Sequence, residues 1–328
     1  MRPIAVYTDV DDLDPEPGMR LLEEAGFDVR LLHTLDPVVI RKEAADAEVL
    51  LVGYAPVDAG TIAALPRLRL ISLLSAGSDH VDLRAASARG VWVSNLPSVA
   101  TEEVSTHALA LTLAVVRNMN FFQAAAAGDY WSRPERPPIR LSTARLGVLG
   151  LGRIGRRFIE MAGPLFGAVS GYDPYIAEDD EALRALGVER SSLAEVVRNA
   201  DVLSLHLPLT AETERLFGAE MLPMMKPGSV IINVSRGGLV DSQALREALD
   251  SGHIGGAGLD VLDAEPPAAD HPLLGHPAVV LTPHIAFLSQ QTRTDYILCQ
   301  ARNAANWLTH GTPHTPVNAP ARSHKAAQ

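Results

Sequence analysis

The sequence contains little cysteine and little lysine. Cys299 is its one cysteine, so no disulfide can form within the chain. No cluster of cysteine and histidine has the spacing of zinc ligands, and we expect no metal site. Lysine supplies only three of the 28 basic residues, and the net charge is −11. Because direct nucleic-acid binding usually requires a one-sided basic surface, this balance predicts that nucleic acid is not a ligand.

Long apolar runs are also absent. No stretch approaches the ~18 unbroken apolar residues of a membrane helix, and the N-terminus lacks the ~7 to 15 apolar residues of a signal peptide. We therefore expect a soluble, cytoplasmic protein. The chain has 328 residues, 47% of them hydrophobic. This is about twice the length of a typical domain, so two domains with two hydrophobic cores are expected.

Short β-branched or aliphatic runs alternate with helical segments along the whole chain. The first series of runs is 4–8, 29–32, 49–52, 70–74 and 91–94. The second series is 146–149, 169–172, 202–205, 230–234, 257–261 and 279–281. Strands separated by helix-length intervals indicate βαβ units and parallel sheets. We predict an α/β fold of two Rossmann-like domains with doubly wound parallel sheets and an active site in the cleft between them.

The order of the elements predicts where the domains begin and end. The chain leaves the first domain near Pro97 and returns to it after His284, through a last helix over 289–310. We expect a first domain of residues 1–97 and 285–318, a second domain of residues 98–284, and a loose tail of residues 319–328. The proline-rich segment from Thr312 has few apolar residues, and we expect it to be loose already from there.

A long helix is expected over residues 101–127. Thr101 is a suitable N-cap, and Gly128 is suited to end the helix. Residues 108–116 are apolar on every face, so this stretch must be covered all round. We predict that a second subunit covers part of it, which gives a homodimer through residues 101–127. Burial within the same chain explains the pattern equally well.

A glycine fingerprint, Gly-x-Gly-x-x-Gly, directly follows the first strand of the second series. Gly150 permits a tight turn, Gly152 lets the backbone approach a pyrophosphate, and Gly155 lets the following helix pack on the strand. The anion then lies at the helix N-terminus, where unpaired N–H groups and the helix dipole favour negative charge. We expect this helix to run to about Phe166.

Asp173 ends the next predicted strand, eighteen residues past Gly155. A carboxylate at this place accepts hydrogen bonds from both hydroxyls of an adenosine ribose but repels a 2′-phosphate. Pro174 and Tyr175 follow it, where an arginine would be suited to a phosphate. The sequence therefore predicts NAD as the cofactor rather than NADP.

Three further motifs each lie at a predicted strand end. They are residues 232–241, which contain Arg236; residues 258–267, which contain Glu265; and residues 281–286, which contain His284. The carboxyl ends of parallel strands line the ligand crevice of an α/β sheet, so these side chains can converge. A guanidinium can bind a carboxylate and polarise a carbonyl, and an imidazole bonded to a carboxylate keeps one tautomer and favours its protonated form. The trio predicts acid–base chemistry on an acidic substrate.

With these motifs the chain resembles the D-isomer-specific 2-hydroxyacid dehydrogenase family. The match covers nearly the whole length and includes residues 75–82 and 95–97 in the first domain. The resemblance implies that Arg236, Glu265 and His284 are catalytic. The implied activity is hydride transfer between NAD and C2 of a 2-oxo acid, with a D-2-hydroxy acid as product and His284 giving or taking the proton.

The resemblance also implies that residues 1–97 and 285–318 form the substrate-binding domain and residues 98–284 the NAD-binding domain, and it implies which residues bind the ligands. Backbone N–H groups near Ala76 and Gly77 hold the substrate carboxylate, and Asp260 orients the nicotinamide carboxamide. The other residues assigned to the cofactor lie in the fingerprint, on the adenosine side and before Arg236: Arg153, Ile154, His206, Pro208, Val234 and Ser235. A glutamate precedes the histidine, where formate-oxidising members have glutamine, so formate is disfavoured. Glyoxylate, hydroxypyruvate and bulkier 2-oxo acids stay open as substrates.

The histidine motif departs from the pattern of most members, which continue with glycine or a small residue and then threonine. Here the chain has Phe287, followed two residues later by Ser289 and Gln290. This variant resembles the branch that contains the C-terminal-binding-protein corepressors. Phe287 is therefore expected to line and crowd the substrate pocket. The alternative function is an NAD(H)-sensing interaction protein of that kind, with weak dehydrogenase activity.

Overall fold

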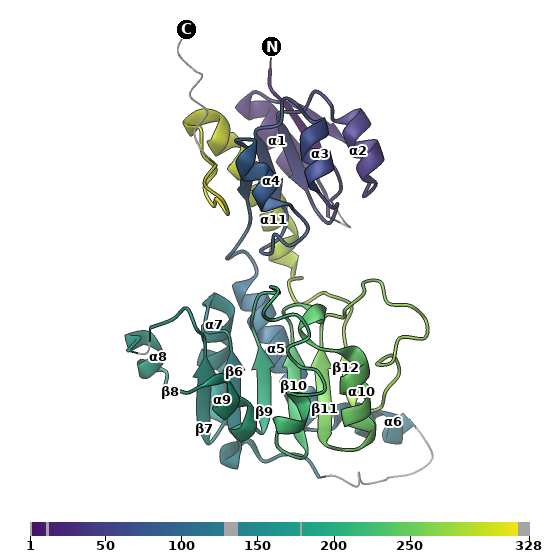
Figure 1. Ribbon diagram of the computed structural model, residues 1–328, viewed down its shortest axis with the longest axis vertical. Coiled ribbons are helices and arrows are strands. Elements are labelled where there is room, and N and C mark those ends of the chain that lie inside the picture. The colour runs from purple at the N-terminus through teal and green to yellow at the C-terminus, as the bar shows by residue number, and fades with distance from the viewer. Residues whose placement is uncertain (1, 11–12, 128–136, 178, 321–328) are drawn as a thin grey trace. The chain divides into compact units, whose positions relative to one another are not determined.

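The structure, a computed structural model, describes residues 2–10, 13–127, 137–177 and 179–320. It divides into two compact units, one of Met1–Ala100 with Leu288–Gln328 and one of Thr101–Phe287 (Figure 1). The boundaries expected after residues 97 and 284 lie three residues from this division. None of the described helices is long and apolar enough to cross a membrane.

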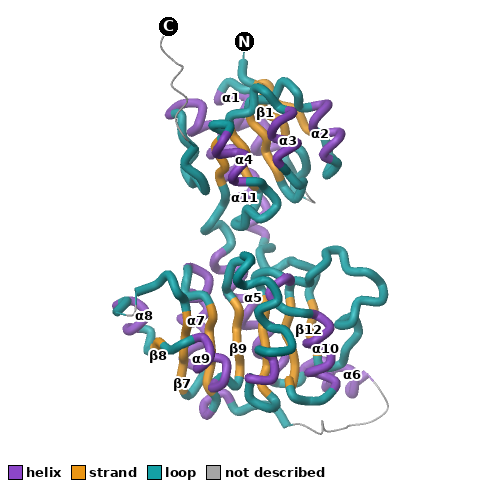
Figure 2. The backbone as a smooth tube through the Cα atoms, in the orientation of Figure 1, coloured by secondary structure: helices purple, strands orange, loops and turns teal. Residues whose placement is uncertain are grey.

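The first unit contains one parallel sheet with the strand order β2-β1-β3-β4-β5. Its strands are β1 (Ile4–Tyr7), β2 (Asp28–Leu31), β3 (Val49–Val52), β4 (Leu70–Leu73) and β5 (Trp92–Ser94). Each predicted run of the first series is confirmed to within one residue. In Figure 2 these strands lie side by side as one sheet. Strands β3 and β4 are buried along their whole length because helices cover both faces of the sheet.

Among the described residues of this unit, five helices cover the sheet. They are α1 (Glu16–Ala25), α2 (Pro37–Glu43), α3 (Ala59–Ala64), α4 (Leu83–Ala88) and α11 (Gln290–His310). Helices α2, α3 and α4 bury Ile40, Ile62 and Ala86 against one face. Helices α1 and α11 pack together on the other face. The amide of Gln300 in α11 donates to the carbonyl of Ser72 at 2.8 Å, so the last helix is an integral part of the first unit.

The segment that follows α11 is fixed against β5, and the expectation that it is loose from Thr312 is wrong. The N–H of Val317 donates to the carbonyl of Val93 at 2.8 Å. The Asn318 Oδ1 accepts from the N–H of Val93, also at 2.8 Å. The proline-rich composition predicted a loose segment because proline has no N–H to donate to a sheet. The residues between the prolines nevertheless supply the polar groups that bond to the edge strand β5. Residues 321–328 of the expected tail lie outside the described residues.

The second unit contains a parallel sheet of seven strands in the order β12-β11-β10-β9-β6-β7-β8. The strands are β6 (Arg145–Leu149), β7 (Ala168–Tyr172), β8 (Val188–Arg190), β9 (Val202–Leu205), β10 (Ser229–Asn233), β11 (Ile254–Leu259) and β12 (Val279–Leu281). All six predicted strands are present. The unpredicted one, β8, carries two charged residues in three positions and lies at the sheet edge, so it has no apolar run. The order reverses between β6 and β9, and such a switch point is where doubly wound sheets bind ligands.

Helices cover both faces of this sheet as well. The α-helices are α5 (Thr101–Val116), α6 (Met119–Ala127), α7 (Arg153–Ala162), α8 (Glu181–Ala185), α9 (Leu193–Asn199) and α10 (Ser242–Asp250). The 3₁₀ segments are η1 (Leu141–Thr143), η2 (Gly163–Leu165), η3 (Leu222–Met224) and η4 (Gly237–Leu239). Leu111 of α5 and Phe158 of α7 share one core cluster with Val148. Val196 of α9 and Leu245 of α10 belong to the core on the opposite face. The helix after the fingerprint ends at Ala162 and continues as η2, close to the expected end.

The single long helix expected over 101–127 is two helices. Helix α5 ends at Val116, and Asn118 has a φ of 53°, a left-handed conformation that asparagine tolerates better than most residues. The apolar pattern continues into α6 across this break, so periodicity does not reveal it. The asparagine side chain of Asn120 donates to the carbonyl of Val279 at 2.7 Å, which fixes α6 to the edge strand β12. Gly128, the expected end of the helix, lies outside the described residues.

Candidate active site

The fingerprint glycines lie where β6 and β9 end beside each other. Gly150 has a φ of 91°, and a Cβ on it would stand 2.2 Å from the carbonyl oxygen of His206. A Cβ on Gly155 would stand 2.0 Å from the carbonyl oxygen of Gly150. Backbone is therefore in direct contact at the switch point of the sheet, and neither position has room for a side chain.

Gly152, in the same loop, is next to open space. A Cβ there would meet nothing within 4 Å, and the residue immediately precedes α7. Open space thus adjoins the N-terminus of α7, where the first N–H groups of a helix have no partner within the helix, and this fits the pyrophosphate of a dinucleotide. Arg153 is exposed at this helix end, and Ile154 is half-buried. The Ile154 carbonyl accepts from the Ser105 hydroxyl at 3.1 Å, so α7 is fixed to α5.

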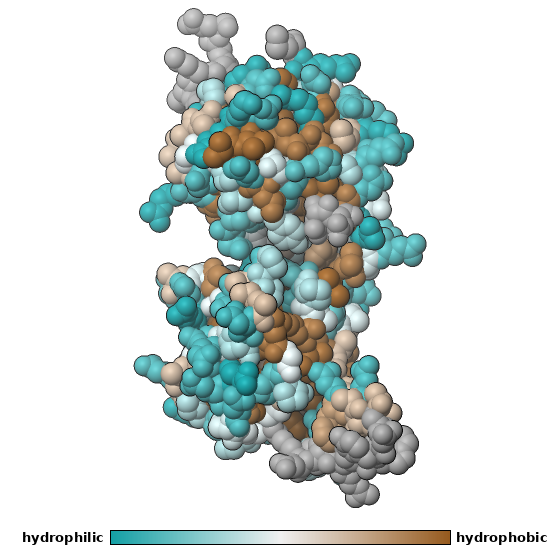
Figure 3. Space-filling model, turned by 90° about the vertical axis from the view of Figure 1, so that its right-hand side faces the viewer, coloured by the Kyte–Doolittle hydropathy of each residue, from teal (hydrophilic) through white to brown (hydrophobic). Residues whose placement is uncertain are grey.

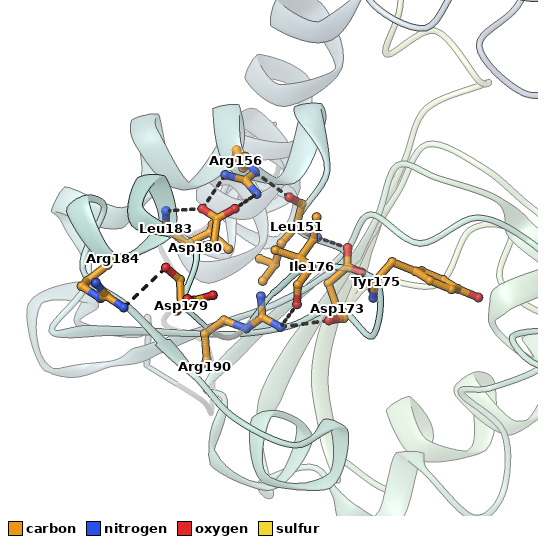
Figure 4. A network of polar contacts seen from close by, with 10 residues as sticks. All are labelled: Leu151, Arg156, Asp173, Tyr175, Ile176, Asp179, Asp180, Leu183, Arg184 and Arg190. Atoms are coloured by element: carbon orange, nitrogen blue, oxygen red, sulfur yellow. Dashed lines mark hydrogen bonds and ion pairs between the residues drawn. The ribbon is translucent and has the colours of Figure 1, made fainter. Parts of the chain in front are cut away.

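Asp173 follows β7 and reaches the fingerprint (Figure 4). Its Oδ2 accepts from the N–H of Leu151 at 2.9 Å, and its Oδ1 accepts from the N–H of Tyr175 at 2.9 Å. Each carboxylate oxygen keeps a lone pair for a further donor. The carboxylate is therefore fixed beside the pyrophosphate cradle, at the place where ribose hydroxyls could donate to it.

An ion pair supports this part of the site. Arg156 donates to both oxygens of Asp180, at 2.9 and 2.7 Å, and its Nε donates to the Leu151 carbonyl at 2.8 Å. The hydrogen bond from Arg156, with a further one from the N–H of Leu183, lowers the pKa of the Asp180 carboxyl to about 2. The pair connects the loop after β7 to the fingerprint (Figure 4).

Arg190 of β8 binds the loop that follows β7. Its Nη2 donates to the carbonyls of Asp173 and Ile176, at 2.9 and 3.1 Å. Its Nε and Nη1 are buried, with no hydrogen-bond partner among the described residues. Nothing local in the sequence signals the pair of Arg156 with Asp180 or the contacts of Arg190, because the bonded residues lie 14 to 24 positions apart.

The structure gives His206 and Pro208 different surroundings. The His206 ring packs on Phe158 with 5.1 Å between ring centroids, and its Nε2 lies 2.9 Å from the Ser204 hydroxyl. Burial lowers the pKa of His206 to about 3, so its ring is neutral. Pro208 is exposed, and its carbonyl accepts from Thr213. The carbonyl of His206, which lies against Gly150, is the part of this segment nearest the fingerprint.

Glu265 and His284 meet beyond the ends of β11 and β12. The His284 Nδ1 lies 2.6 Å from the Glu265 Oε2, and the Glu265 Oε1 accepts from the N–H of Leu262 at 2.9 Å. Arg236 lines the same cavity of about 330 Å³. The Arg236 Nη1 donates to the Ser235 carbonyl at 2.8 Å. The predicted trio is thus brought together from three separate strand ends.

Opposing effects act on Glu265. Burial acts to raise the pKa of its carboxyl, but the hydrogen bond and the charge of His284, with smaller effects from the Leu262 N–H and Arg236, outweigh burial. The pKa therefore lies below its usual value. Glu265 is ionised throughout the neutral range, and a carboxylate at Nδ1 leaves Nε2 as the ring nitrogen that can exchange a proton with a substrate.

The strand end before Arg236 is rigid. The Ser235 hydroxyl donates to the Leu205 carbonyl at 2.8 Å, and the Ser235 N–H donates to the Asn233 Oδ1 at 3.0 Å. Val234 is buried in the core beneath. Gly237 then packs so closely on the next loop that a Cβ would stand 1.9 Å from the carbonyl carbon of Leu262.

Asp260 is buried at the end of β11, with 1% of its surface exposed. Its two carboxylate oxygens accept from the backbone N–H groups of Ile285 and Ala286, at 3.0 and 2.9 Å. The residue implied to orient the nicotinamide is therefore already bonded to the turn that carries His284. Phe287 lies just after this turn and is half-buried.

The predicted substrate loop lies in the first unit, after β4. The Asn95 side chain donates to the Ala76 carbonyl at 2.6 Å, and the Ser75 hydroxyl donates to the Gly77 carbonyl at 2.7 Å. These bonds fix the two carbonyls of the loop. Among the residues that the structure describes, no three His, Cys, Asp or Glu side chains gather as ligands for a metal ion.

The second unit is a dinucleotide-binding domain. It has the strand order of a doubly wound sheet, the glycine fingerprint after β6 and the carboxylate of Asp173 after β7. Residues 109–286 match the family model described as "D-isomer specific 2-hydroxyacid dehydrogenase, NAD binding domain". The chain belongs to the D-isomer-specific 2-hydroxyacid dehydrogenase family.

Proteins with similar sequences are dehydrogenases and reductases, which agrees with this membership. A glyoxylate reductase of Korarchaeum cryptofilum is 35% identical over 93% of both chains. A chloroplastic D-3-phosphoglycerate dehydrogenase of Arabidopsis thaliana is 34% identical over 93% of this chain and 49% of its own length. The chain spans about half the length of the phosphoglycerate dehydrogenases that it matches.

Solved structures of the same kind superimpose on nearly the whole chain. The D-lactate dehydrogenase of Aquifex aeolicus, solved with NAD and lactic acid, has a TM-score of 0.87 at 27% identity and covers 97% of this chain and 100% of its own. An NADPH-dependent glyoxylate/hydroxypyruvate reductase of Sinorhizobium meliloti, solved with NADP and malonate, has a TM-score of 0.86 at 30% identity and covers 99% and 100%. The prediction of two Rossmann-like α/β domains is confirmed.

Proposed function

We propose that the chain is an NAD-dependent oxidoreductase that interconverts a 2-oxo acid and a D-2-hydroxy acid. The 2.6 Å contact between His284 and Glu265, in a cavity that Arg236 also lines, carries the proposal. Membership of the dehydrogenase family and the NAD-binding domain support it. The relatives named above are dehydrogenases and reductases, and they give no support to the alternative of a corepressor-like interaction protein.

When bound, NADH supplies the hydride that adds to C2 of the 2-oxo acid. His284, protonated, gives its Nε2 proton to the carbonyl oxygen, which becomes the hydroxyl of the product. Glu265 stabilises the imidazolium before transfer and keeps Nδ1 occupied. Arg236 meets the substrate carboxylate and the charge that develops on the oxygen. In oxidation of the hydroxy acid, neutral His284 takes the proton.

Other residues bind the dinucleotide and the substrate. The cradle at Gly152, with Asp173 beside it, holds the dinucleotide, and Asp260 orients the nicotinamide end. Backbone N–H groups at Ala76 and Gly77 hold the substrate carboxylate, and Phe287 limits the size of the substrate side chain. The placement of the substrate between the two units and a cytoplasmic location stay predictions.

The direct test is NADH oxidation with a panel of 2-oxo acids. Glyoxylate, hydroxypyruvate, pyruvate and a branched 2-oxo acid, each supplied at the same NADH concentration, should include at least one that supports turnover. Polarimetry or a stereospecific coupled assay should identify the product as the D-isomer. NADH binding without turnover on any of these acids would instead favour the interaction-protein alternative, which a pull-down at controlled NADH concentration would then examine.

A carboxylate at Asp173 should discriminate between the two nicotinamide dinucleotides. Asp173→Ser removes the acceptor for the ribose hydroxyls and the repulsion of a 2′-phosphate. We expect the KM for NADH to rise about tenfold, the scale of one charged hydrogen bond, and the preference over NADPH to decrease. Steady-state kinetics with both coenzymes measures this. Asp179→Ser removes a carboxylate from the same loop and is the control; unchanged selectivity in Asp173→Ser would contradict the assignment.

The charge of Glu265 should set the pH range of activity. Its carboxyl has a pKa below the usual value, so it is ionised at neutral pH and favours protonated His284. In Glu265→Gln this stabilisation is lost, and reduction, which needs the imidazolium, should decline at lower pH than in the wild type. Oxidation should extend to lower pH by the same reasoning. The dependence of kcat/KM on pH in both directions measures the shift.

The control for that experiment is Asp263→Asn, which removes another carboxylate of the same cavity. Asp263 is bonded to His271 and Ser242 rather than to His284. Its loss should move the pH profile less than the loss of Glu265. Identical profiles for the wild type and Glu265→Gln would show that the carboxylate does not control the protonation of His284.

We also propose a homodimer through residues 101–127. Several apolar side chains of α5 and α6 are exposed: Leu113 at 36%, Met119 at 52%, Phe121 at 36% and Phe122 at 36%. Figure 3 shows apolar surface on the side of the second unit where α6 lies. Such a patch on a helix pair fits a second copy of the same chain. Analytical ultracentrifugation should give twice the mass of one chain, and Phe121→Asp should lower it to that of one chain.

A further inference from the structure

The turn that carries His284 has a conformation that must be imposed from outside. His284 has a φ of 54°, in the left-handed region that residues with a side chain seldom adopt. Such a conformation persists only where the surrounding structure holds it, and functional sites are where it is most often found. The residues that hold this turn therefore decide where the imidazole points.

Asp260 makes three successive bonds to the turn. Its carbonyl accepts from the N–H of His284 at 2.7 Å. Its carboxylate accepts from Ile285 at 3.0 Å and from Ala286 at 2.9 Å. One buried residue thus fixes three consecutive peptide groups, and the path of the backbone through His284 follows from it.

Two side chains fix the Asp260 carboxylate in turn. The Thr282 hydroxyl lies 2.6 Å from the Asp260 Oδ1 and, because an ionised carboxylate only accepts, the hydroxyl donates. Its single hydrogen is then used. The His107 Nε2, 2.9 Å from the same hydroxyl oxygen, must therefore be the donor to Thr282. His107 belongs to α5, and its Nε2 also lies 3.5 Å from the Asp260 Oδ1.

We propose that His107, Thr282 and Asp260 are positioning residues that hold His284 in register with Glu265. His107 donates to the Thr282 hydroxyl, Thr282 donates to the Asp260 carboxylate, and the N–H groups of the turn donate to the same carboxylate. His107, which directly precedes the apolar stretch 108–116 of α5, thereby acquires a function. This inference rests on the proposed function, because it assigns His284 as the proton donor.

The test removes one hydroxyl. Thr282→Val keeps the shape of the side chain but breaks both of its hydrogen bonds. We expect kcat for 2-oxo acid reduction to decrease about 10- to 100-fold, the scale of a small misplacement of a catalytic group, with the Kd for NADH within about twofold. Thr282→Ser, which restores the hydroxyl, should recover most of the activity. His107→Phe should give a smaller decrease of the same kind, since Thr282 still reaches Asp260.

Thr112→Val is the matched control. The Thr112 hydroxyl is buried in α5 and donates to the Ala108 carbonyl at 2.7 Å, within the helix itself. This variant should retain wild-type kcat. A pH profile distinguishes positioning from a general loss of folded protein: lost protein scales the whole profile, whereas a displaced His284 loses its Glu265 partner and moves the fall of reduction to lower pH.

A proton NMR measurement does not depend on activity. The Nδ1 proton of His284, bonded to Glu265, should give a low-field resonance that disappears in His284→Gln and is lost or shifted in folded Thr282→Val but not in Thr112→Val. Wild-type kcat and an unchanged resonance in Thr282→Val would overturn the inference. If the wild type reduces no 2-oxo acid but the resonance still depends on Thr282, the proposed function fails while the positioning role stands.

Discussion

Replacing His284 by glutamine should lower turnover by about 100-fold or more, the usual scale for the loss of a general acid or base. Glutamine keeps a polar side chain of similar length but cannot exchange a proton with the substrate oxygen. The affinity for NADH should change by less than about twofold, because the dinucleotide cradle lies at the switch point between β6 and β9. Single-turnover kinetics and calorimetric titration with NADH measure the two quantities separately.

A second histidine of the same unit provides the comparison. His253 lies with its Nε2 3.2 Å from the Leu222 carbonyl, and it is not among the residues that line the cavity of Arg236, Glu265 and His284. His253→Gln should retain turnover. If His284→Gln does too, within about threefold of the wild type, the proton comes from another group and the assignment of the acid is wrong.

Gly237→Ala should strongly destabilise the second unit. The new Cβ would stand 1.9 Å from the Leu262 carbonyl carbon and 2.4 Å from the Asp263 N, and both are backbone atoms that cannot rotate away. The loops that carry Arg236 and Glu265 must then separate. We expect a loss of about 3 kcal/mol in the free energy of unfolding, the upper end for an overpacked core, together with a large decrease in kcat. Urea unfolding and kinetics on the folded fraction measure both.

Gly163→Ala is the control for this substitution. Gly163 has a helical φ of −50°, and its Cβ would meet only side chains, the nearest at 3.5 Å. The change should alter the free energy of unfolding by less than about 0.5 kcal/mol. Equal behaviour of Gly163→Ala and Gly237→Ala would mean that the loop after β10 can move away from Leu262, and that the close packing is not needed to hold Arg236 near Glu265.

The parts of the fold that local pattern determines were predictable. Each buried strand carries its own apolar run, so eleven strands could be located from the sequence. β8 could not, because Glu189 and Arg190 give it no such run. The break at Asn118 was hidden because α5 and α6 are both apolar. The pairing of β8 at the sheet edge and the left-handed conformation of Asn118 leave no periodic pattern of apolar residues in the sequence.

The same division holds for the candidate site. Glycine spacing, the acid after β7 and the three strand-end motifs indicated residues that the structure does place at neighbouring strand ends, among them Glu265 and His284. Their supporting partners were not predictable. Arg156 and Asp180, or His107 and Thr282, are 24 and 175 residues apart in sequence, and only the completed sheet brings them together. Which roles these residues perform stays a prediction until the variants are measured.

The last helix and the strand-like segment at residues 315–318 have a consequence for biosynthesis. Gln300 donates to Ser72 across more than two hundred positions, and Asn318 completes the edge at Val93. While the chain emerges from the ribosome, residues 1–100 therefore lack the helix that covers β3 and β4 on one sheet face until residues 290–318 are translated. The dinucleotide unit, continuous from 101 to 287, has all its own residues before that moment. The unit that contains residues 1–100 is thus completed after the dinucleotide unit, and the uncovered face of β4 is what a chaperone would need to shield in the interval.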